Sequence, residues 1–135
     1  LAVALDEGLT VPALPGVDRL GLRGIAQSRL DLVERARQGK LQKAEIERGT
    51  FTVTSLASSG VMQFTAIINP PQSGILSIGM TQEKLVLKEG KVEARRFAVF
   101  GLSVDHRAAD GAYGAAFLDS LKKKLENPLT AFLQY

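Results

Sequence analysis

The chain has 135 residues, of which 45% are hydrophobic and 23% are charged, a composition typical of one globular domain with its own core. Its net charge of +3 comes from charges mixed along the sequence. The densest basic run, at 122–124, is better explained as a solvated helix face than as a phosphate-binding patch, so a nucleic-acid partner is not indicated. With no cysteine and one histidine, disulfides and a cysteine nucleophile are excluded, and little remains for a transition-metal site. No apolar run approaches the ~18 residues of a membrane span.

Two short apolar runs open the sequence, "LAVAL" at 1–5 and "LTVPAL" at 9–14, and both are typical of strands. The first residues lack the signature of a signal peptide, and we expect them to belong to an element that begins further upstream. From 20 to 38 the apolar residues recur with a helical period, which predicts a helix. Asp18 is the candidate residue that caps its start, and Gly39 is the candidate residue that ends it.

The stretch "TFTVTS" at 50–55 alternates strictly between apolar and hydroxyl side chains. One face of the predicted strand is therefore apolar, and the other carries threonines that include Thr52 and Thr54. Two more strands are predicted, "FTAII" at 64–68 and "GILSIG" at 74–79, with the breaker-rich loop "NPPQSG" between them.

The second half of the chain predicts a hairpin, a strand and a helix in succession. "KLVLKEGKVEARR" at 84–96 is a hairpin with its turn at Glu89 and Gly90. "RFAVFGLSV" at 96–104 is apolar on both faces, so we expect a central strand that is covered on both sides. A last helix is predicted over 110–126. The fold class is therefore α/β, with helices packed on a mixed β-sheet.

The only histidine, His106, follows the predicted strand 96–104 in the stretch "SVDHRAADGAYG". A buried strand that leads through a turn into a helix is a common position for ligand-contacting groups in open sheets. The small residues that follow, mostly Ala and Gly, would let a ligand or the backbone approach the imidazole. On position alone, a histidine packed in the core is an equally good interpretation, and both stay open on that ground.

The pattern His-x-x-x-Asp-Gly at the end of a buried strand resembles the motif of CoA-dependent acyltransferases built like chloramphenicol acetyltransferase. "DHRAADGA" followed by "FLDSLKKKLENP" is similar to the C-terminal catalytic domain of the dihydrolipoyl acyltransferases, the core subunits of the 2-oxo acid dehydrogenase complexes. "GLTVPAL", "ERARQGKL", "GTFTVTSL" and "FTAIINPPQSGILSIG" resemble that family in the same order. The resemblance implies that residues 1–135 are the C-terminal part of a single catalytic domain, incomplete at its N-terminus and without a lipoyl or subunit-binding domain.

The resemblance implies roles for four residues. His106 would be the general base that takes a proton from the thiol of CoA or dihydrolipoamide as the sulfur attacks the partner thioester. Thr54 stands where the family usually has a serine whose hydroxyl stabilises the oxyanion, and its added methyl group makes a reduced activity possible. Without the resemblance, Thr54 would be read as a β-forming residue on a wet face. Asp110 would hold the loop in shape, and Arg107 would pair with a carboxylate.

The resemblance also implies substrates and partners. CoA and a lipoyl group carried by a partner domain would be the substrates, and no metal is expected. The active site would lie between subunits of a homotrimer, with His106 from one and Thr54 from its neighbour. The trimers would assemble into a larger core that binds dehydrogenase and dihydrolipoamide dehydrogenase components. The compartment would be the cytoplasm of a bacterium or archaeon, or the mitochondrial matrix of a eukaryote, with no nucleic-acid or membrane partner.

The C-terminal tail is a candidate contact between trimers, because a monomer has little reason to expose an apolar cluster. Its apolar residues are Leu129, Phe132, Leu133 and Tyr135. A tail that folds back on its own domain is the alternative.

Two other functions stay open. Another CoA-dependent acyltransferase of the same fold would act on a hydroxyl, but such sequences usually carry a second histidine where Asp105 stands. A non-catalytic scaffold or fragment of a core is favoured by the missing N-terminal part, whereas the intact His106, Asp110 and Thr54 oppose it. The acyl group, whether acetyl, succinyl or branched-chain, is not indicated.

Overall fold

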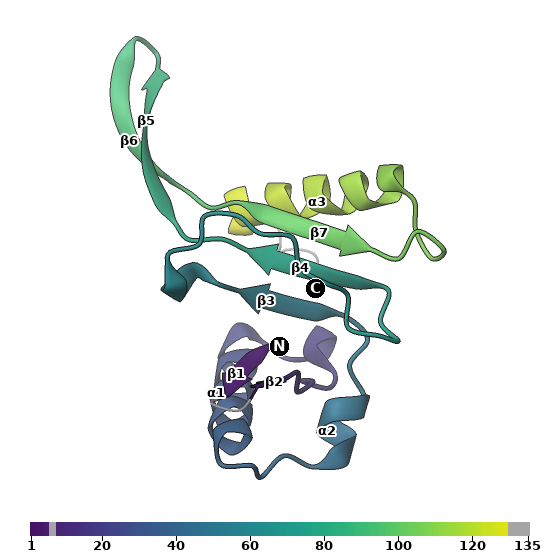
Figure 1. Ribbon diagram of the computed structural model, residues 1–135. Helices are drawn as coiled ribbons and strands as arrows, with labels where there is room; N and C mark the ends of the chain where they lie inside the picture. Colours follow the sequence, from purple (N-terminus) through teal and green to yellow (C-terminus); the bar gives the residue numbers. More distant parts are fainter. Residues whose placement is uncertain (6–7, 130–135) are drawn as a thin grey trace.

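The computed structural model describes residues 1–5 and 8–129 of the chain (Figure 1). Its helices and strands are β1 (Val3–Leu5), β2 (Gly8–Thr10), α1 (Leu22–Arg37), α2 (Lys43–Glu47), β3 (Thr52–Ser55), β4 (Gly74–Ile78), β5 (Gln82–Lys88), β6 (Lys91–Phe97), β7 (Phe100–Val104) and α3 (Gly111–Glu126). Single turns of 3-10 helix occupy Val17–Arg19 and Ala57–Ser59. The tail residues Phe132, Leu133 and Tyr135 lie outside the described residues.

The centre of the fold is a three-stranded mixed sheet in which β4 lies between β3 and β7. β3 runs parallel to β4 and β7 runs antiparallel to it, which confirms the predicted α/β fold with a mixed sheet. β4 is the most enclosed strand, since Ile78 alone of its five residues is not buried. The prediction of a central strand over 96–104 is wrong. Phe97 still belongs to β6, and among the described strands β7 pairs with β4 only.

One face of the sheet is covered by α3, which lies along β7 in Figure 1. Gly114 of α3 packs against Leu102 of β7, and the ring centroids of Phe51 and Phe117 lie 5.8 Å apart. Because side chains alternate along a strand, Leu102 and the residues paired with it across the sheet point toward α3. The residues before and after them in each strand point to the other face. The other face therefore carries the hydroxyl groups of Thr52, Thr54, Ser77 and Ser103.

That second face is covered by the segment 61–69, which contains no strand. The Ser77 Oγ donates to the carbonyl oxygen of Phe64 at 3.0 Å, and the Ser103 Oγ donates to that of Ala66 at 2.7 Å. The predicted strand at 64–68 is therefore wrong. Carbonyl groups of this segment are satisfied by serine hydroxyls that rise from the sheet, instead of by a neighbouring strand.

β5 and β6 form the predicted antiparallel hairpin, which extends away from the sheet in Figure 1. Its turn residues Glu89 and Gly90 have φ angles of 50° and 77°, as a type I′ turn requires. Leu85, Leu87 and Val92 share one face of the hairpin and are 74%, 75% and 67% exposed. Because a two-stranded ribbon by itself is only marginally stable in water, this apolar face is suited to burial against another folded surface.

α1 begins at Leu22 and is followed by Gly39 in the left-handed conformation, with φ of 67°, as predicted for its end. The predicted cap at its start is wrong. Asp18 lies in the preceding 3-10 turn, and Gly21 occupies the N-cap position. The helix starts two residues later than its apolar pattern indicates, because the chain first makes that separate turn.

The short helix α2 was not predicted from the sequence, because five residues are too few to display a helical period. Gln42 and Glu45 form a capping box at its start, which satisfies backbone N–H groups that have no partner inside the helix. The Glu45 carboxylate also accepts two hydrogen bonds of 2.7 Å from Arg35 of α1. This contact joins the two helices. Within the described ranges, no helix combines the length and apolar character that crossing a membrane requires.

Candidate active site

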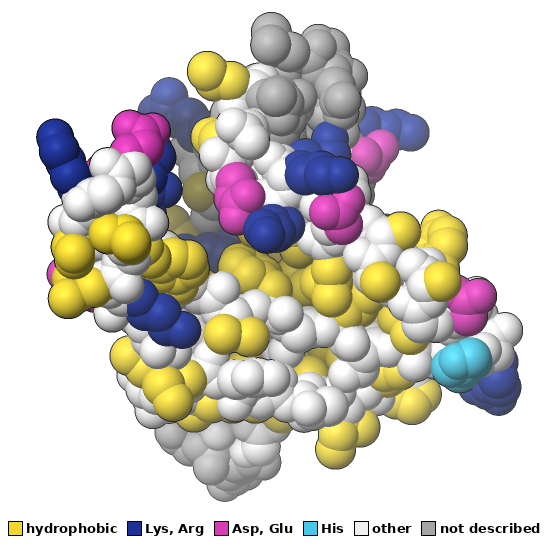
Figure 2. Space-filling view, turned by 90° about the horizontal axis from the view of Figure 1, so that it is seen from above, with side chains coloured by type: hydrophobic (Ala, Val, Ile, Leu, Met, Phe, Trp, Pro, Cys, Tyr) yellow, Lys and Arg dark blue, Asp and Glu magenta, His cyan; other side chains and the backbone are white. Residues whose placement is uncertain are grey.

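β7 leads directly to His106. The strand ends at Val104. The N–H group of the next residue, Asp105, donates to the Ser73 carbonyl oxygen at 2.9 Å, just past the last paired residues of β4 and β7. The His106 side chain is exposed, and Figure 2 shows the single histidine of the chain, in cyan, at the margin of the molecule. Of the two interpretations that the sequence left open, a histidine packed in the core is therefore wrong for this chain.

The turn around His106 is built on Asp105. The Asp105 carbonyl oxygen accepts from the N–H groups of Ala108 and Ala109, and its carboxylate accepts from both the backbone and the guanidinium of Arg107. These hydrogen bonds lower the pKa of the Asp105 carboxyl to about 2. The prediction that Arg107 pairs with a carboxylate is confirmed, and the partner is the aspartate two residues before it.

Asp110 stands at the N-cap of α3, where its Oδ1 accepts from the backbone N–H of Tyr113 at 2.8 Å. This is the geometry of a helix cap, in which a short side chain satisfies one of the first N–H groups of the helix. Its position fixes where the turn after His106 becomes α3. The contact that the structure shows for Asp110 is therefore a structural one.

Thr54 lies on the hydroxyl-bearing face, in β3 at one edge of the described sheet. It is opposite Ser77 in β4, which in turn is opposite Gly101 in β7. Thr54 is half-buried, and its hydroxyl makes no hydrogen bond to any residue that the structure describes. Thr52 differs sharply, because it is 1% exposed and its hydroxyl donates to the Gln72 Oε1 at 2.5 Å. The two threonines therefore differ. The Thr52 hydroxyl is buried and hydrogen-bonded, whereas the Thr54 hydroxyl is available to a ligand.

A single copy of the chain does not bring Thr54 and His106 together. Gly101 is level with Thr54 across two strand spacings, and His106 lies five residues further along the chain. With ~3.3 Å per residue along the strand and ~4.8 Å between strands, the two Cα atoms are roughly 19 Å apart. No substrate atom can contact both residues of one copy.

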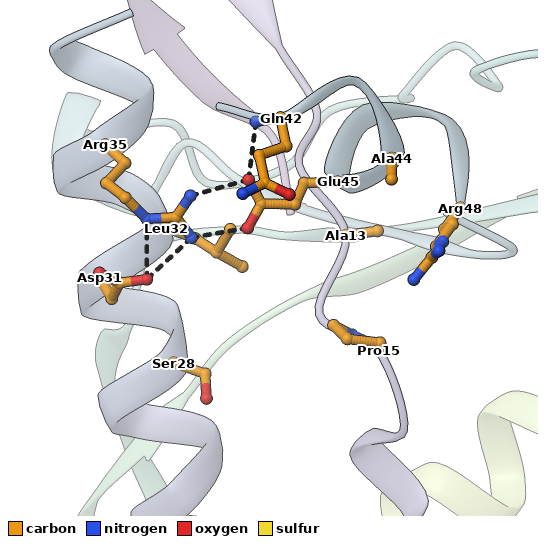
Figure 3. Close-up of a pocket in the computed structure, with 10 residues that line it drawn as sticks. All are labelled: Ala13, Pro15, Ser28, Asp31, Leu32, Arg35, Gln42, Ala44, Glu45 and Arg48. Atoms are coloured by element: carbon orange, nitrogen blue, oxygen red, sulfur yellow. Dashed lines mark hydrogen bonds and ion pairs between the residues drawn. The ribbon is translucent and has the colours of Figure 1, made fainter. Parts of the chain in front are cut away.

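The charged cavity between α1 and α2 has a volume of about 370 Å³ and is shown in Figure 3. Arg35 points between Asp31 and Glu45, with its Nη2 at 2.8 Å from Asp31 Oδ2 and 2.7 Å from Glu45 Oε1. These contacts raise the pKa of the Arg35 guanidinium and lower the pKa of Glu45 to about 2. Because Arg35 of α1 is paired with Glu45 of α2, the network stabilises the helix pair, and none of the candidate catalytic residues lines it. The sequence shows the Asp31–Arg35 spacing but not the partner ten residues away.

A second cavity of about 830 Å³ lies between α3 and the segment 95–100. Leucines of α3 form its apolar wall, and Arg95, Arg96 and Lys122 contribute the basic groups at its edge. His106, Thr54 and Asp110 do not line this cavity either. Across the described part of the chain, no three His, Asp or Glu side chains gather closely enough to hold a metal ion. The candidate catalytic residues thus lie outside both of these cavities in one copy.

Comparison with protein families gives a match over nearly the whole chain. A family model described as 2-oxoacid dehydrogenases acyltransferase, catalytic domain, matches residues 1–133. Among curated proteins, the mitochondrial dihydrolipoyllysine-residue acetyltransferase component of the pyruvate dehydrogenase complex of Dictyostelium discoideum is 43% identical over 98% of the chain. The succinyltransferase component of the 2-oxoglutarate dehydrogenase complex of Rickettsia felis is 40% identical over 95%. The chain spans 21% and 32% of these two relatives.

Solved structures show the same fold. The cubic core of a pyruvate dehydrogenase multienzyme complex matches with a TM-score of 0.90 at 34% identity, over 98% of this chain and 54% of that chain. A structure of the dihydrolipoamide acetyltransferase of Azotobacter vinelandii matches with a TM-score of 0.89 at 34% identity, over the same shares. That structure concerns a serine, a histidine and an asparagine in the catalytic mechanism of the enzyme. The serine precedes the histidine by 52 positions, and the asparagine follows the histidine by 4.

Proposed function

Because this chain belongs to the 2-oxoacid dehydrogenase acyltransferase family, we propose that residues 1–135 are the C-terminal part of its catalytic domain and transfer an acyl group between CoA and dihydrolipoamide. The observation that carries the proposal is a shared spacing. Thr54 precedes His106 by 52 positions and Asp110 follows it by 4, which are the separations of the three residues studied in the Azotobacter vinelandii enzyme. At 34% identity over 98% of the chain, this agreement supports catalytic roles for the same three positions here.

His106 acts as the general base. Its imidazole accepts the proton of the attacking thiol, from CoA or dihydrolipoamide, while the sulfur forms a bond to the carbonyl carbon of the other thioester. A positioned general base typically accelerates such a step by ~10²–10⁴-fold. The exposed imidazole of His106, which has no partner among the described residues, is available for this role.

Thr54 stabilises the oxyanion of the tetrahedral intermediate by donating its hydroxyl hydrogen bond. The intermediate then collapses, the carbon–sulfur bond of the original thioester breaks, and the leaving thiolate recovers the proton from the His106 imidazolium. Both thiols are substrates, so no acyl group is attached to the protein. A hydroxyl that is half-buried and has no acceptor within the described structure suits this donor role.

Asp110 supports the site by shaping the turn after His106. It caps α3 through the N–H of Tyr113, and an asparagine side chain accepts the same hydrogen bond. The asparagine at the matching spacing in the Azotobacter vinelandii enzyme is therefore consistent with a role in structure instead of proton transfer.

The active site is shared between copies of the chain. Within one copy the Cα atoms of Thr54 and His106 are roughly 19 Å apart, so His106 of one copy acts with Thr54 of a neighbour. A homotrimer supplies three such sites by cyclic symmetry. The exposed apolar face of the β5–β6 hairpin, formed by Leu85, Leu87 and Val92, supports an association between copies because such a face is costly to leave in water.

In the complete protein the trimers build the core of a 2-oxo acid dehydrogenase complex. The similarity to a cubic core supports this assembly. CoA and a lipoyl group on a partner domain are the substrates, and dehydrogenase and dihydrolipoamide dehydrogenase components are the partners. Acetyl- and succinyltransferases are both among the relatives, so the acyl group is open. The compartment is the mitochondrial matrix or the bacterial or archaeal cytoplasm.

The test combines size and activity in one sample. The oligomeric state is measured by light scattering, and thioester formation on dihydrolipoamide is measured with acetyl-CoA and with succinyl-CoA as donors. Chloramphenicol replaces dihydrolipoamide in a third assay. Transfer to dihydrolipoamide that disappears in His106→Ala supports the proposal. An assembled protein that transfers neither group, a His106→Ala variant with the parent rate, or a preference for chloramphenicol would contradict it.

A further inference from the structure

Asp105 uses every one of its polar groups to hold the turn that carries His106. Its backbone N–H donates to Ser73 at 2.9 Å, and its carbonyl oxygen accepts from Ala108 and Ala109 at 2.8 and 3.1 Å. Its Oδ1 accepts from the backbone N–H of Arg107 at 3.0 Å. These bonds reach the residues on both sides of His106, so the backbone of the histidine is held from both directions.

The Arg107 guanidinium closes this arrangement. Its Nε lies 2.9 Å from Asp105 Oδ1 and 3.1 Å from Oδ2, and its Nη2 lies 2.6 Å from Oδ2. A planar guanidinium fits a carboxylate in this paired geometry better than a lysine ammonium does. The side chains before and after His106 are therefore bound to each other, whereas the imidazole between them contacts no hydrogen-bonding partner in the described residues.

We propose that Asp105 and Arg107 are positioning residues that fix the turn at His106 and so hold its imidazole where the attacking thiol must arrive. This inference rests on the proposed function. A general base acts only within hydrogen-bond reach of the proton that it accepts, and a displacement of ~1 Å costs on the order of 100-fold in rate. An exposed ion pair contributes little to folding stability. The effect of removing the Asp105 side chain is thus expected in kcat and not in the fold.

Two variants of Asp105 separate positioning from charge. Asp105→Asn keeps an Oδ1 acceptor for the Arg107 N–H but removes the charge, whereas Asp105→Ala removes both. We expect Asp105→Ala to lower kcat about 10- to 100-fold with KM values within about twofold, and Asp105→Asn to stay within about threefold of the parent. Asp119→Ala is the matched control, because it removes an exposed pair with Lys123 of the same 2.6 Å length and should leave kcat unchanged.

The inference is overturned if Asp105→Ala keeps kcat within about twofold of the parent, or if Asp105→Asn falls as far as Asp105→Ala. Amide hydrogen exchange of Arg107 and Ala108, measured by NMR, gives a readout that needs no activity. Exchange about tenfold faster in Asp105→Ala, but not in Asp105→Asn, supports the inference, and equal exchange in all three proteins contradicts it. A parent protein that transfers no acyl group would refute the proposed function and leave this exchange test intact.

Discussion

Thr54 and His106 lie toward opposite ends of the same three-stranded sheet. Thr54 is level with Gly101 through Ser77, and His106 follows five residues after Gly101, beyond the end of β7. The resulting separation, roughly 19 Å between the Cα atoms, exceeds what one thioester carbonyl can bridge. Any reaction that uses both side chains requires two copies of the chain.

The first prediction is that two inactive variants restore activity when they are mixed. In an equal mixture of His106→Ala and Thr54→Ala that has been dissociated and reassembled, one site in four receives an intact histidine from one copy and an intact threonine from the next. About a quarter of the parent activity is therefore expected. The measurement is the transfer assay before and after reassembly, and a mixture as inactive as its components would show that the site is not shared.

The second prediction separates catalysis from stability at two neighbouring threonines. Thr54→Val removes an unpaired hydroxyl and should lower kcat about 10²–10³-fold with no loss of stability. Thr52→Val leaves the buried Gln72 oxygen without its hydrogen bond and should lower the free energy of unfolding by about 1–3 kcal/mol while kcat is retained.

Thr54→Ser is the conservative control for this pair, because it keeps the hydroxyl and removes only the methyl group. Its activity should equal or exceed that of the parent. Urea unfolding and steady-state kinetics on all three variants give the two readouts. Equal kcat values for Thr54→Val and the parent would remove Thr54 from the mechanism.

The third prediction concerns the apolar face of the β5–β6 hairpin. Leu87 is 75% exposed and pairs with Val92, so Leu87→Lys places a charge where we expect a second copy to pack. The variant should be monomeric by light scattering, and its activity should fall with its assembly. Lys88→Gln, at the end of the same strand, should keep the parent mass. A Leu87→Lys protein of unchanged mass would show that the copies meet elsewhere.

The fourth prediction concerns the close approach of β4 and β7. A Cβ atom on Gly101 would lie 2.6 Å from the Ser77 Oγ, and that oxygen is held by hydrogen bonds to Phe64 and Gly101. Gly101→Ala should therefore lower the free energy of unfolding by about 1–3 kcal/mol. Gly111→Ala, where a Cβ meets nothing within 4 Å, is the control and should not destabilise the protein. The free energies of unfolding of the two variants, taken from their unfolding curves, are the measurement. An equal loss of stability in both variants would rule out the Ser77 contact as the cause.

The fifth prediction is a pH dependence of stability from Glu45. The folded protein lowers the pKa of this carboxyl from 4.5 to about 2 through the hydrogen bonds from Arg35 and the Gln42 N–H. The unfolded chain thus binds the proton at higher pH, and the stabilisation is present above about pH 4.5 and lost as the pH falls toward 2. Asp105, lowered from 3.8 to about 2, acts in the same direction.

Glu45→Gln should therefore lose less stability than the parent as the pH falls through this range, and Arg35→Met should behave similarly. Urea unfolding at several pH values between about 5 and 3 measures the slope. A Glu45→Gln variant with the parent slope would mean that the Arg35–Glu45 pair does not carry this effect.

Local features of the fold could be predicted from the sequence. Gly39 ends α1 in the left-handed conformation, and Glu89 and Gly90 form the hairpin turn between strands that are adjacent in sequence. The threonine alternation of β3 likewise follows from the backbone period alone. Asp18 shows the limit of such reasoning, because its residue type suits a cap but the chain makes a separate turn before α1 starts at Leu22.

The sequence by itself determined the order of most elements, the two faces of β3, the His106 turn and the 52-residue interval from Thr54, because these depend on residue identity and on near neighbours. Only the tertiary structure decided that β4 is the central strand, that 64–68 is a covering segment and that Arg35 meets Glu45. It also decided that Thr54 and His106 stay apart within one copy. Strand neighbours are chosen by packing between distant segments, and the periodicity of a single segment carries no information about which segment will pack against it.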